Sequence, residues 1–157
     1  MNRSILLSIA VLIIISLIIG LWFILYLQSL STKQGFGIYL AENDKLIISD
    51  KEIISYNDLS YELELTDEGV DRIKALDVPM SGKPFAAKLG EKTIYEGSFW
   101  VPWSSQSYSG IVINILSIQN NNIKLEQGYP SSSFFEGADL RDNSELSNHF
   151  RSLQKLR

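Results

Sequence analysis

The stretch from Ile5 to Leu27, ILLSIAVLIIISLIIGLWFILYL, contains no charged residue and decides which solvent the rest of the chain meets. Seventeen of its residues are Leu, Ile, Val or Phe. Each of these favours insertion of a helix into a bilayer by about 0.3 to 0.6 kcal/mol near the helix centre. A helix of this length measures about 34 Å, slightly more than the roughly 30 Å hydrocarbon layer. The sequence therefore predicts a transmembrane helix at residues 5–27.

The apolar segment has two alternatives to a membrane anchor. A cleaved signal peptide has an apolar core of about 7 to 15 residues followed by a small-x-small site. The tripeptide Ser29-Leu30-Ser31 would serve as such a site, but the apolar core is too long. A buried helix of a soluble protein is rarely apolar on every face over this length. We therefore favour a signal-anchor that stays attached.

The orientation of the anchor follows from the few charges beside it. Residues 1–4 carry Arg3 and the terminal amine, and a short positive N-terminus stays in the cytoplasm. Trp22 and Tyr26 suit the outer interface, where an aromatic ring can place its polar tip among the headgroups. The sequence thus predicts a single-pass protein of the cell membrane, with its N-terminus cytoplasmic and its C-terminal domain outside.

A second feature of the anchor concerns helix pairing. Ser16 and Gly20 lie four residues apart and therefore on one face of a helix. Small residues at this spacing let another membrane helix approach closely. Pairing through this face is an expectation about partners, beside the membrane itself.

Composition limits what the remaining residues can do. The chain of 157 residues has 18 Asp and Glu against 14 Lys and Arg. This acidic balance argues against nucleic acid as a partner, because phosphate binding needs a basic surface. There is no cysteine, so disulfides, thiolate metal sites and a cysteine nucleophile are excluded. The single histidine, His149, leaves no histidine metal cluster or Ser-His-Asp triad in an obvious form. We expect no metal, no cofactor and no enzyme activity.

Beyond the anchor, residues 28–35 read as a short polar stalk and residues 36–157 as an α+β domain. Alternating or continuous apolar runs predict strands, and capping residues before an apolar stripe predict helices. The expected strands are residues 37–40 and 46–48 as a hairpin, then 59–65, 85–89, 93–96, 98–101, 110–116 and 123–125, the last two pairing with each other. The expected helices are residues 51–56, then 67–76 with Thr66 as N-cap, and 143–155.

The segment from Leu65 to Ile115 resembles the first extracytoplasmic domain of the SecD and SecDF family, accessory membrane proteins of the Sec protein-export channel. The likeness lies in three runs. These are Leu65-Thr66-Asp67-Glu68-Gly69 opening a helix, Gly82-Lys83-Pro84-Phe85-Ala86-Ala87-Lys88-Leu89 entering a hairpin, and Ile94-Tyr95-Glu96-Gly97 before the apolar strand Gly110 to Ile115.

The resemblance implies a ferredoxin-like or related sheet-plus-helices sandwich that follows a first transmembrane helix. This chain has Gly90-Glu91 where the family usually has Asp-Gly, and its later glycine-rich turn is reduced to residues 106–110. It also lacks the further membrane helices that carry partner contacts and proton coupling in that family. A role near the export machinery is implied, whereas driving export is not.

The aromatic residues after residue 98 are the main candidates for a binding site. Trp100, Trp103 and Tyr108 could line a groove for an extended peptide, since aromatic anchors dominate many binding surfaces. The simpler alternative, which we favour, is that most of these rings fill the core of a domain without disulfides. Strand alternation puts Phe99 and Trp100 on opposite faces, so only some of the rings can be exposed.

Other polar groups have structural explanations. Asp67, Glu68 and Asp71 sit at the start of a helix, where the dipole favours negative charge. The serines at positions 104–105 and 131–133 have no partner base at a recognisable spacing. Arg141 is expected to form a local ion pair or a cap with Asp139 and Asp142, and the side chain of His149 to be solvated or to lie at the boundary between core and surface.

The function expected from the sequence is binding of protein or peptide by an anchored outside domain beside the export machinery. The alternative is a structural subunit of a membrane complex that has no ligand of its own. A membrane-bound hydrolase is disfavoured because the motifs of hydrolases are missing.

Overall fold

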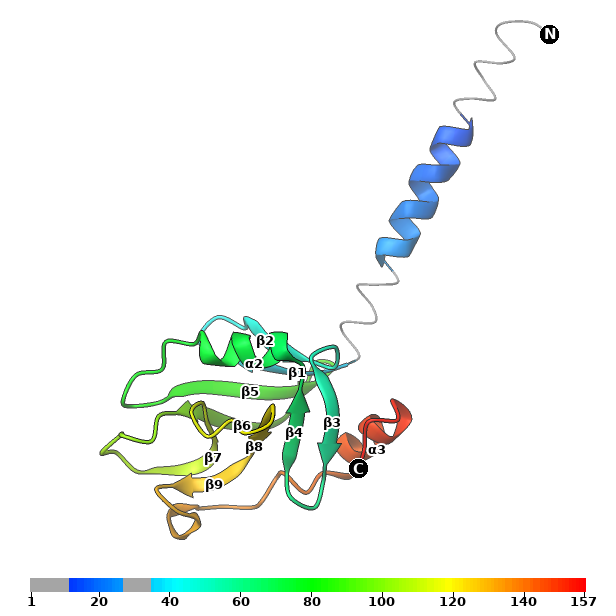
Figure 1. The fold of residues 1–157 in the computed structure, drawn as a ribbon. Coiled ribbons are helices and arrows are strands. Elements are labelled where there is room, and N and C mark those ends of the chain that lie inside the picture. The colour runs from blue at the N-terminus through cyan, green and yellow to red at the C-terminus, as the bar shows by residue number, and fades with distance from the viewer. Residues whose placement is uncertain (1–11, 27–34) are drawn as a thin grey trace, which may run out of the picture. The chain divides into compact units, whose positions relative to one another are not determined.

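The computed structural model describes residues 12–26 and 35–157. The chain divides into two units, Met1–Gln34 and Gly35–Arg157. In the first unit, residues 12–26 form an α-helix whose side chains are exposed (Figure 1). None of the helices formed by these described residues has the length and apolar character needed to cross a membrane. Residues 1–11 and 27–34, which hold the expected cytoplasmic N-terminus, both ends of the expected anchor and most of the expected stalk, lie outside the described residues.

The expected pairing face of the anchor lies within its described part. The hydroxyl of Ser16 donates a 3.0 Å hydrogen bond to the carbonyl of Ile13, one turn earlier in the same helix. A Cβ added to Gly20 would meet no atom within 4 Å. This face of the helix is therefore open, and helix pairing through it stays a prediction.

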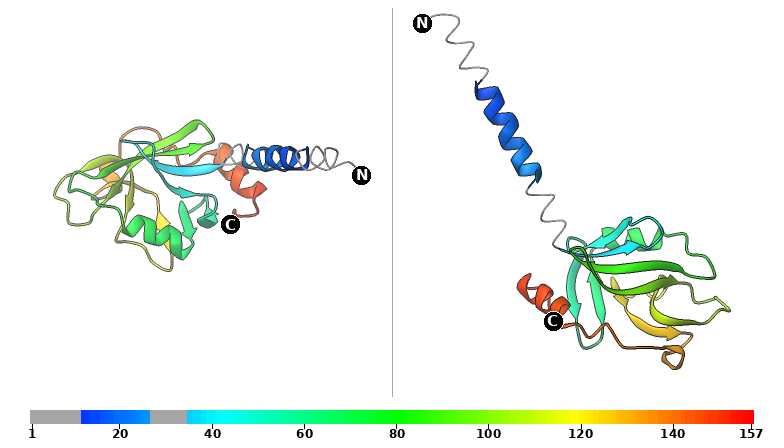
Figure 2. Two further views of the ribbon diagram at one scale, coloured as in Figure 1. Left: turned by 90° about the horizontal axis from the view of Figure 1, so that it is seen from above. Right: turned by 180° about the vertical axis from the view of Figure 1, so that it is seen from behind.

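The second unit is an α+β domain with two sheets, as expected from the sequence (Figures 1 and 2). The larger sheet has six strands in the order β2-β1-β5-β6-β7-β9, and the smaller has three in the order β3-β4-β8. Two α-helices and a short 3-10 helix complete the domain. The elements are β1 Phe36–Leu40, β2 Leu46–Ser49, β3 Ile53–Asn57, β4 Glu62–Leu65, α2 Asp67–Lys74, β5 Lys83–Leu89, β6 Lys92–Trp100, β7 Tyr108–Asn114, β8 Asn122–Lys124, β9 Glu126–Tyr129, η1 Ser132–Phe134 and α3 Ser144–Ser152.

Most strands of the larger sheet are joined by short antiparallel hairpins. The β1–β2 hairpin has its polar turn at residues 41–45, and the β5–β6 hairpin turns at Gly90 and Glu91, both as expected from the sequence. The β6–β7 pair is parallel instead, with Trp100 opposite Asn114. Because parallel strands start at the same end of a sheet, residues 101–107 must return along the sheet to the start of β7. This return carries Trp103.

The core lies between the two sheets and the α-helices. Apolar side chains of alternating strand residues meet there, such as Ile111 and Ile113 of β7, while Val112 points to the other face of the larger sheet. Helix α2 contributes Val70 and Ile73 to the core, and α3 contributes its own apolar stripe. The fully buried large side chains of the core are Phe36, Ile38, Ile48, Ile53, Tyr56, Leu63, Leu65, Phe85, Tyr95, Phe99 and Phe150.

The starts of the second and third of the three expected helices are confirmed. Thr66 caps α2, because its hydroxyl accepts a 3.2 Å hydrogen bond from the backbone N–H of Gly69. Asn143 caps α3 in the same way, with its side-chain oxygen accepting from the N–H of Leu146. Each cap satisfies a backbone donor that has no partner within the helix.

The expected helix at residues 51–56 is wrong, because these residues form a turn and strand β3. Glu52 reaches back to the N–H and the hydroxyl of Ser49, at 2.8 and 2.7 Å, and closes a tight turn. After the turn, Tyr56 pairs with Leu63 of β4, and its ring packs against Phe150 of α3. Burial of this ring in the core favours a strand over a helix, and the local capping pattern gives no sign of that burial.

The expected pairing of residues 123–125 with the apolar strand β7 is also wrong. β8 pairs with β4, placing Ile123 opposite Leu63 in the core. The turn that precedes β8 is a two-residue hairpin turn in which Asn120 and Asn121 both have positive φ, at 49° and 63°. Asparagine tolerates this conformation better than most residues. The turn therefore directs β8 to the smaller sheet.

The order of elements also differs from the ferredoxin-like sandwich that the resemblance implies. That fold follows the order β-α-β-β-α-β. Here four strands precede α2, and five strands separate α2 from α3. The fold class α+β is confirmed, with a mixed larger sheet in place of the ferredoxin-like one.

Candidate functional site

Trp100, one of the three aromatic residues expected to bind a partner, lies in the interior. Trp100 is only 1% exposed. The ring packs against Tyr108 and Tyr129, with ring centroids 5.4 and 5.5 Å away. A Cβ added to Gly82 would lie 2.2 Å from this ring, so the loop before β5 rests directly on it and requires glycine there. Trp100 therefore holds loops onto the outer face of the larger sheet, and no partner reaches it in this conformation.

Trp103 differs from Trp100, because it is 62% exposed. The residues on both sides of Trp103 are nevertheless fixed by side-chain hydrogen bonds. The hydroxyl of Tyr129 donates to the carbonyl of Pro102 at 2.5 Å, and the hydroxyl of Ser104 donates to the carbonyl of Met80 at 2.5 Å. The same Ser104 oxygen accepts from the N–H of Gln106. An exposed indole thus stands on a well-supported loop.

Tyr108 is intermediate between these two cases. It is half-buried, with its ring over Gly110, whose added Cβ would lie 2.8 Å from the ring. Burial raises the pKa of the Tyr108 hydroxyl, and the nearby charge of Glu96 raises it further. The hydroxyl therefore stays protonated at neutral pH and keeps its ability to donate a hydrogen bond.

The loop of Trp103 and the point where the chain enters the domain lie at opposite ends of strand β5. Lys83, at the start of β5, pairs with Phe99 near the Trp103 loop, whereas Leu89, at its end, pairs with Phe36. Gly35 accepts a hydrogen bond from the N–H of Gly90 at that same end. Met80, 44% exposed, lies with Trp103 at the far end. These two exposed apolar side chains, Met80 and Trp103, form what we call the aromatic end.

Two of the three carboxylates at the start of α2 have structural partners. Glu68 pairs with Arg72 at 2.6 Å on the surface of α2, and Asp67 accepts from the amide of Asn121 at 2.7 Å. Within residues 12–26 and 35–157, His, Asp and Glu side chains form no group of three or more that could hold a metal ion. Arg141 pairs with Asp139 at 2.7 Å, as expected from the sequence.

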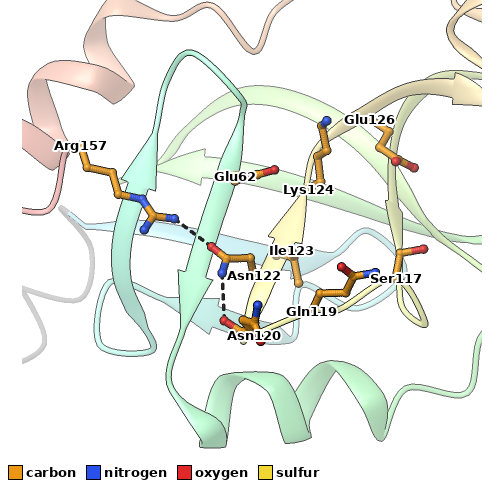
Figure 3. A pocket seen from close by; sticks show the side chains of 9 residues that line it. All are labelled: Glu62, Ser117, Gln119, Asn120, Asn122, Ile123, Lys124, Glu126 and Arg157. Carbon is orange, nitrogen blue, oxygen red and sulfur yellow. Dashed lines mark hydrogen bonds between the residues drawn. The ribbon is translucent and has the colours of Figure 1, made fainter.

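A polar pocket on the smaller sheet was not expected from the sequence. It measures about 420 Å³ and lies between β4, β8 and β9 (Figure 3). Arg157 donates to Asn122 at 2.9 Å across one wall. The nine lining residues are Glu62, Ser117, Gln119, Asn120, Asn122, Ile123, Lys124, Glu126 and Arg157. Because the lining mixes acidic, basic and amide side chains, the pocket does not indicate one chemical class of ligand.

A second hollow, of about 400 Å³, lies beside the first half of β6. Its walls come from Thr93–Glu96 of β6, from Gly110 and Ile111 of β7, and from the segment at residues 135–140. The apolar part of these walls includes Phe135, Ala138 and Leu140. These residues are scattered in the sequence and show no periodic pattern, so sequence reasoning could not group them.

No protein-family model, no curated protein and no solved structure matches this chain.

Proposed function

We propose that this chain is a single-pass membrane protein whose outside domain binds protein or peptide through the aromatic end. The uncharged apolar segment at residues 5–27 supports the anchor, and the short positive N-terminus supports the orientation. The resemblance of residues 65–115 to the SecD family supports a place near the protein-export machinery. The proposal makes the domain an accessory binding module without chemistry of its own.

The observation that carries the proposal is the exposed indole of Trp103 on a loop fixed at both sides. Tryptophan is among the residues that contribute most to protein interfaces. A ring that is already held in place loses little freedom when a partner covers it, so more of the contact energy remains as affinity. The position of the aromatic end, opposite the point where the chain enters the domain, leaves it accessible to a partner.

A photo-cross-linking amino acid placed at position 103 of the full chain in its own membranes tests the proposal. We expect cross-links to polypeptide partners. The matched control is the same substitution at Leu59, an apolar residue in the β3–β4 turn of the smaller sheet. Leu59 is 89% exposed, and its N–H donates a hydrogen bond to the side chain of Asn57. Equal cross-linking from both positions would contradict a binding role for the aromatic end.

The pattern of products separates the two candidate functions. Many cross-linked polypeptides, varying with the cell's exported proteins, support a binding module. One stable partner in constant ratio supports the structural subunit of a membrane complex.

The anchor and its orientation need their own test. A reporter active only outside the cytoplasm, fused after Arg157, should be active. Protease added to intact spheroplasts should then remove the domain. A domain that stays protected under these conditions would reverse the proposed orientation.

A further inference from the structure

Strand β6 lacks a strand partner along part of one side. On one side β5 pairs with β6 from Lys92 opposite Leu89 to Phe99 opposite Lys83, with an irregularity at Ile94, because Tyr95 lies opposite Ala87 and Thr93 opposite Lys88. On its other side, β7 pairs with β6 only from Gly97, opposite Ile111, to Trp100. Within the described part of the chain, Thr93–Glu96 therefore have no paired strand residue on this side, which we call the free edge, and the hollow of about 400 Å³ lies beside them.

At Glu96 the backbone of this edge turns its polar groups toward β7 and the hollow. The carbonyl of Pro84 accepts from the N–H of Ala41 of the β1–β2 hairpin, so it points away from β6. In an antiparallel pair, the polar groups of residues alternate between the two sides of a strand. Ser98, opposite Pro84, therefore turns its polar groups toward β7, and so does Glu96, two residues earlier.

The N–H of Glu96 would meet the carbonyl of Ser109 if the parallel ladder continued. That carbonyl instead accepts from the N–H of Glu136 at 2.9 Å. The segment at residues 135–140 thus occupies the Ser109 carbonyl that Glu96 of β6 would have bonded. The β6–β7 ladder therefore does not extend to Glu96. A strand edge left in this state is a template for another chain.

Two other strand edges of the domain are covered by the chain itself. The edge of β3 is covered by the last residues, since Tyr56 bonds to Lys155 and Arg157 through their backbones at 2.7 and 2.9 Å. At β9, an added Cβ on Gly128 would lie 2.7 Å from the backbone nitrogen of Phe135. The edge at Thr93–Glu96 has no such cover from the described residues and opens onto a hollow of ligand size.

The hollow has apolar walls and an acidic rim. Leu140 is 49% exposed although it faces this hollow, and Phe135 is half-buried. The charged residues that line it are Glu96 and Glu136. Both are exposed, and neither forms an ion pair with another described residue. The surface therefore complements a chain that brings apolar and positively charged side chains.

We propose that this hollow binds an extended peptide with alternating apolar and basic residues, which adds a short strand beside Thr93–Glu96. The main chain of the peptide would bond to the free edge, an apolar side chain would pack against Phe135 and Leu140, and basic side chains would reach Glu96 and Glu136. This inference rests on the proposed function and deepens it, because it names the class of peptide and a second contact surface.

The test measures peptide affinity with the full chain in a neutral detergent. The probe is a blocked peptide of about six residues, a common strand length, in which Lys and Val alternate. We expect saturable binding that weakens as salt rises, because charge contributes. Two comparison peptides separate the sources of affinity. One carries Glu in place of Lys, and the other is methylated at its backbone nitrogens along one edge. Both should bind at least about tenfold more weakly, which corresponds to about 1.4 kcal/mol.

A pair of leucine variants tests the location. Leu140→Lys removes an apolar wall and adds repulsion to a basic peptide, so binding should fall at least about tenfold. Leu153→Lys is the matched control, because Leu153 is similarly exposed at 41% but lies at the end of α3. Equal affinity of the Leu140→Lys variant and the parent overturns the inference. So does undiminished binding of the methylated peptide, or the absence of binding by the Lys–Val peptide.

The two tests fail independently of each other. If partners cross-link at position 103 but Leu140→Lys does not weaken peptide binding, the proposed function stands and this inference is overturned. If peptide binding depends on Leu140 but no partner cross-links at position 103, the hollow stands as a peptide site and the binding role of the aromatic end is overturned.

Discussion

The hydroxyl of Ser104 donates a 2.5 Å hydrogen bond to the carbonyl of Met80, 24 residues earlier in the chain. This bond joins the return between β6 and β7 to the loop that leads into β5. Since Trp103 precedes Ser104, the bond also fixes one side of the exposed indole. Local sequence holds no sign of it, because two loops that are far apart in the chain must first meet.

Ser104→Ala should weaken partner binding more than it weakens the fold. Loss of the hydrogen bond costs about 1 kcal/mol and leaves the Trp103 loop without this support. Cross-linking from position 103 should then decrease, while the midpoint of thermal unfolding falls only slightly. Ser105→Ala is the control, since Ser105 is exposed and adjacent. Equal cross-linking by the two variants would show that the bond does not preorganise the loop.

Trp100 and Trp103 should respond in opposite ways to truncation. Trp100→Ala removes a buried ring from between Gly82, Tyr108 and Tyr129, and should destabilise the domain by about 3 to 5 kcal/mol. Trp103→Ala removes an exposed ring and should change the free energy of unfolding by less than about 0.5 kcal/mol. Urea unfolding, followed by far-ultraviolet circular dichroism, measures both. A large loss of stability with Trp103→Ala would place its ring in the core and contradict its role as a surface contact.

The sequence predicts this fold well where structure depends on neighbouring residues. The turn at residues 41–45, the cap at Thr66 and the hairpin at Gly90 each follow from local chemistry, and the structure contains all three. The expected helix at residues 51–56 fails, because Ser49 and Glu52 make the same local bonds in a turn as at a helix start. Tyr56 then pairs with Leu63 of β4, and its backbone bonds to Lys155 and Arg157 at the end of the chain.

The candidate site is predictable from sequence to a smaller degree. Alternation of side chains along β6 correctly places Phe99 and Trp100 on opposite faces of the larger sheet. It does not reveal that loops cover the outer face, where Trp100 lies. The hollow beside β6 depends on where β7 stops pairing and on one hydrogen bond from Glu136. Leu140, an apolar residue among polar ones, is the single local signal that a surface of this kind exists.

Acid should destabilise the domain through Glu52. Burial alone would raise the pKa of this carboxyl, but hydrogen bonds from Ser49 and the charge of Arg72 outweigh burial and hold the pKa below its ordinary value. A group with a lowered pKa in the folded state stabilises it above the ordinary pKa of about 4.3, and this contribution is lost as the pH falls further. The free energy of unfolding should therefore decrease between about pH 5 and pH 3.

Glu52→Gln isolates this effect. The amide keeps the shape of the side chain but loses the charge, so the variant should be less stable at neutral pH and less sensitive to acid. Glu91→Gln, at an exposed hairpin turn, is the control and should retain the acid sensitivity of the parent. An unchanged slope of stability against pH in Glu52→Gln would assign the acid response to other carboxyls, such as Asp139, whose pKa is lowered by its hydrogen bonds with Arg141.

Arg141 connects three parts of the domain. Its guanidinium bonds to both oxygens of Asp139 at 2.8 and 2.7 Å, donates to the carbonyl of Leu125 at 2.6 Å, and lies 4.1 Å from the ring centroid of Tyr61. It is buried, at 8% exposure. Because Asp139 and Leu140 are adjacent, these contacts also hold the outer wall of the hollow in place.

Arg141→Lys should destabilise the domain by about 2 to 3 kcal/mol, since an ammonium group can neither bind Asp139 with two parallel bonds nor stack on Tyr61 in the same way. Hydrogen exchange should accelerate first at residues 138–142, before the sheets respond. Arg151→Lys is the control, because Arg151 is exposed and its guanidinium donates to the side chain of Asn148 in the same helix. With the wall loosened, the Lys–Val peptide should also bind Arg141→Lys more weakly than Arg151→Lys. Identical exchange in the two variants would mean that the segment at residues 135–140 is held by Glu136 and Phe135 alone.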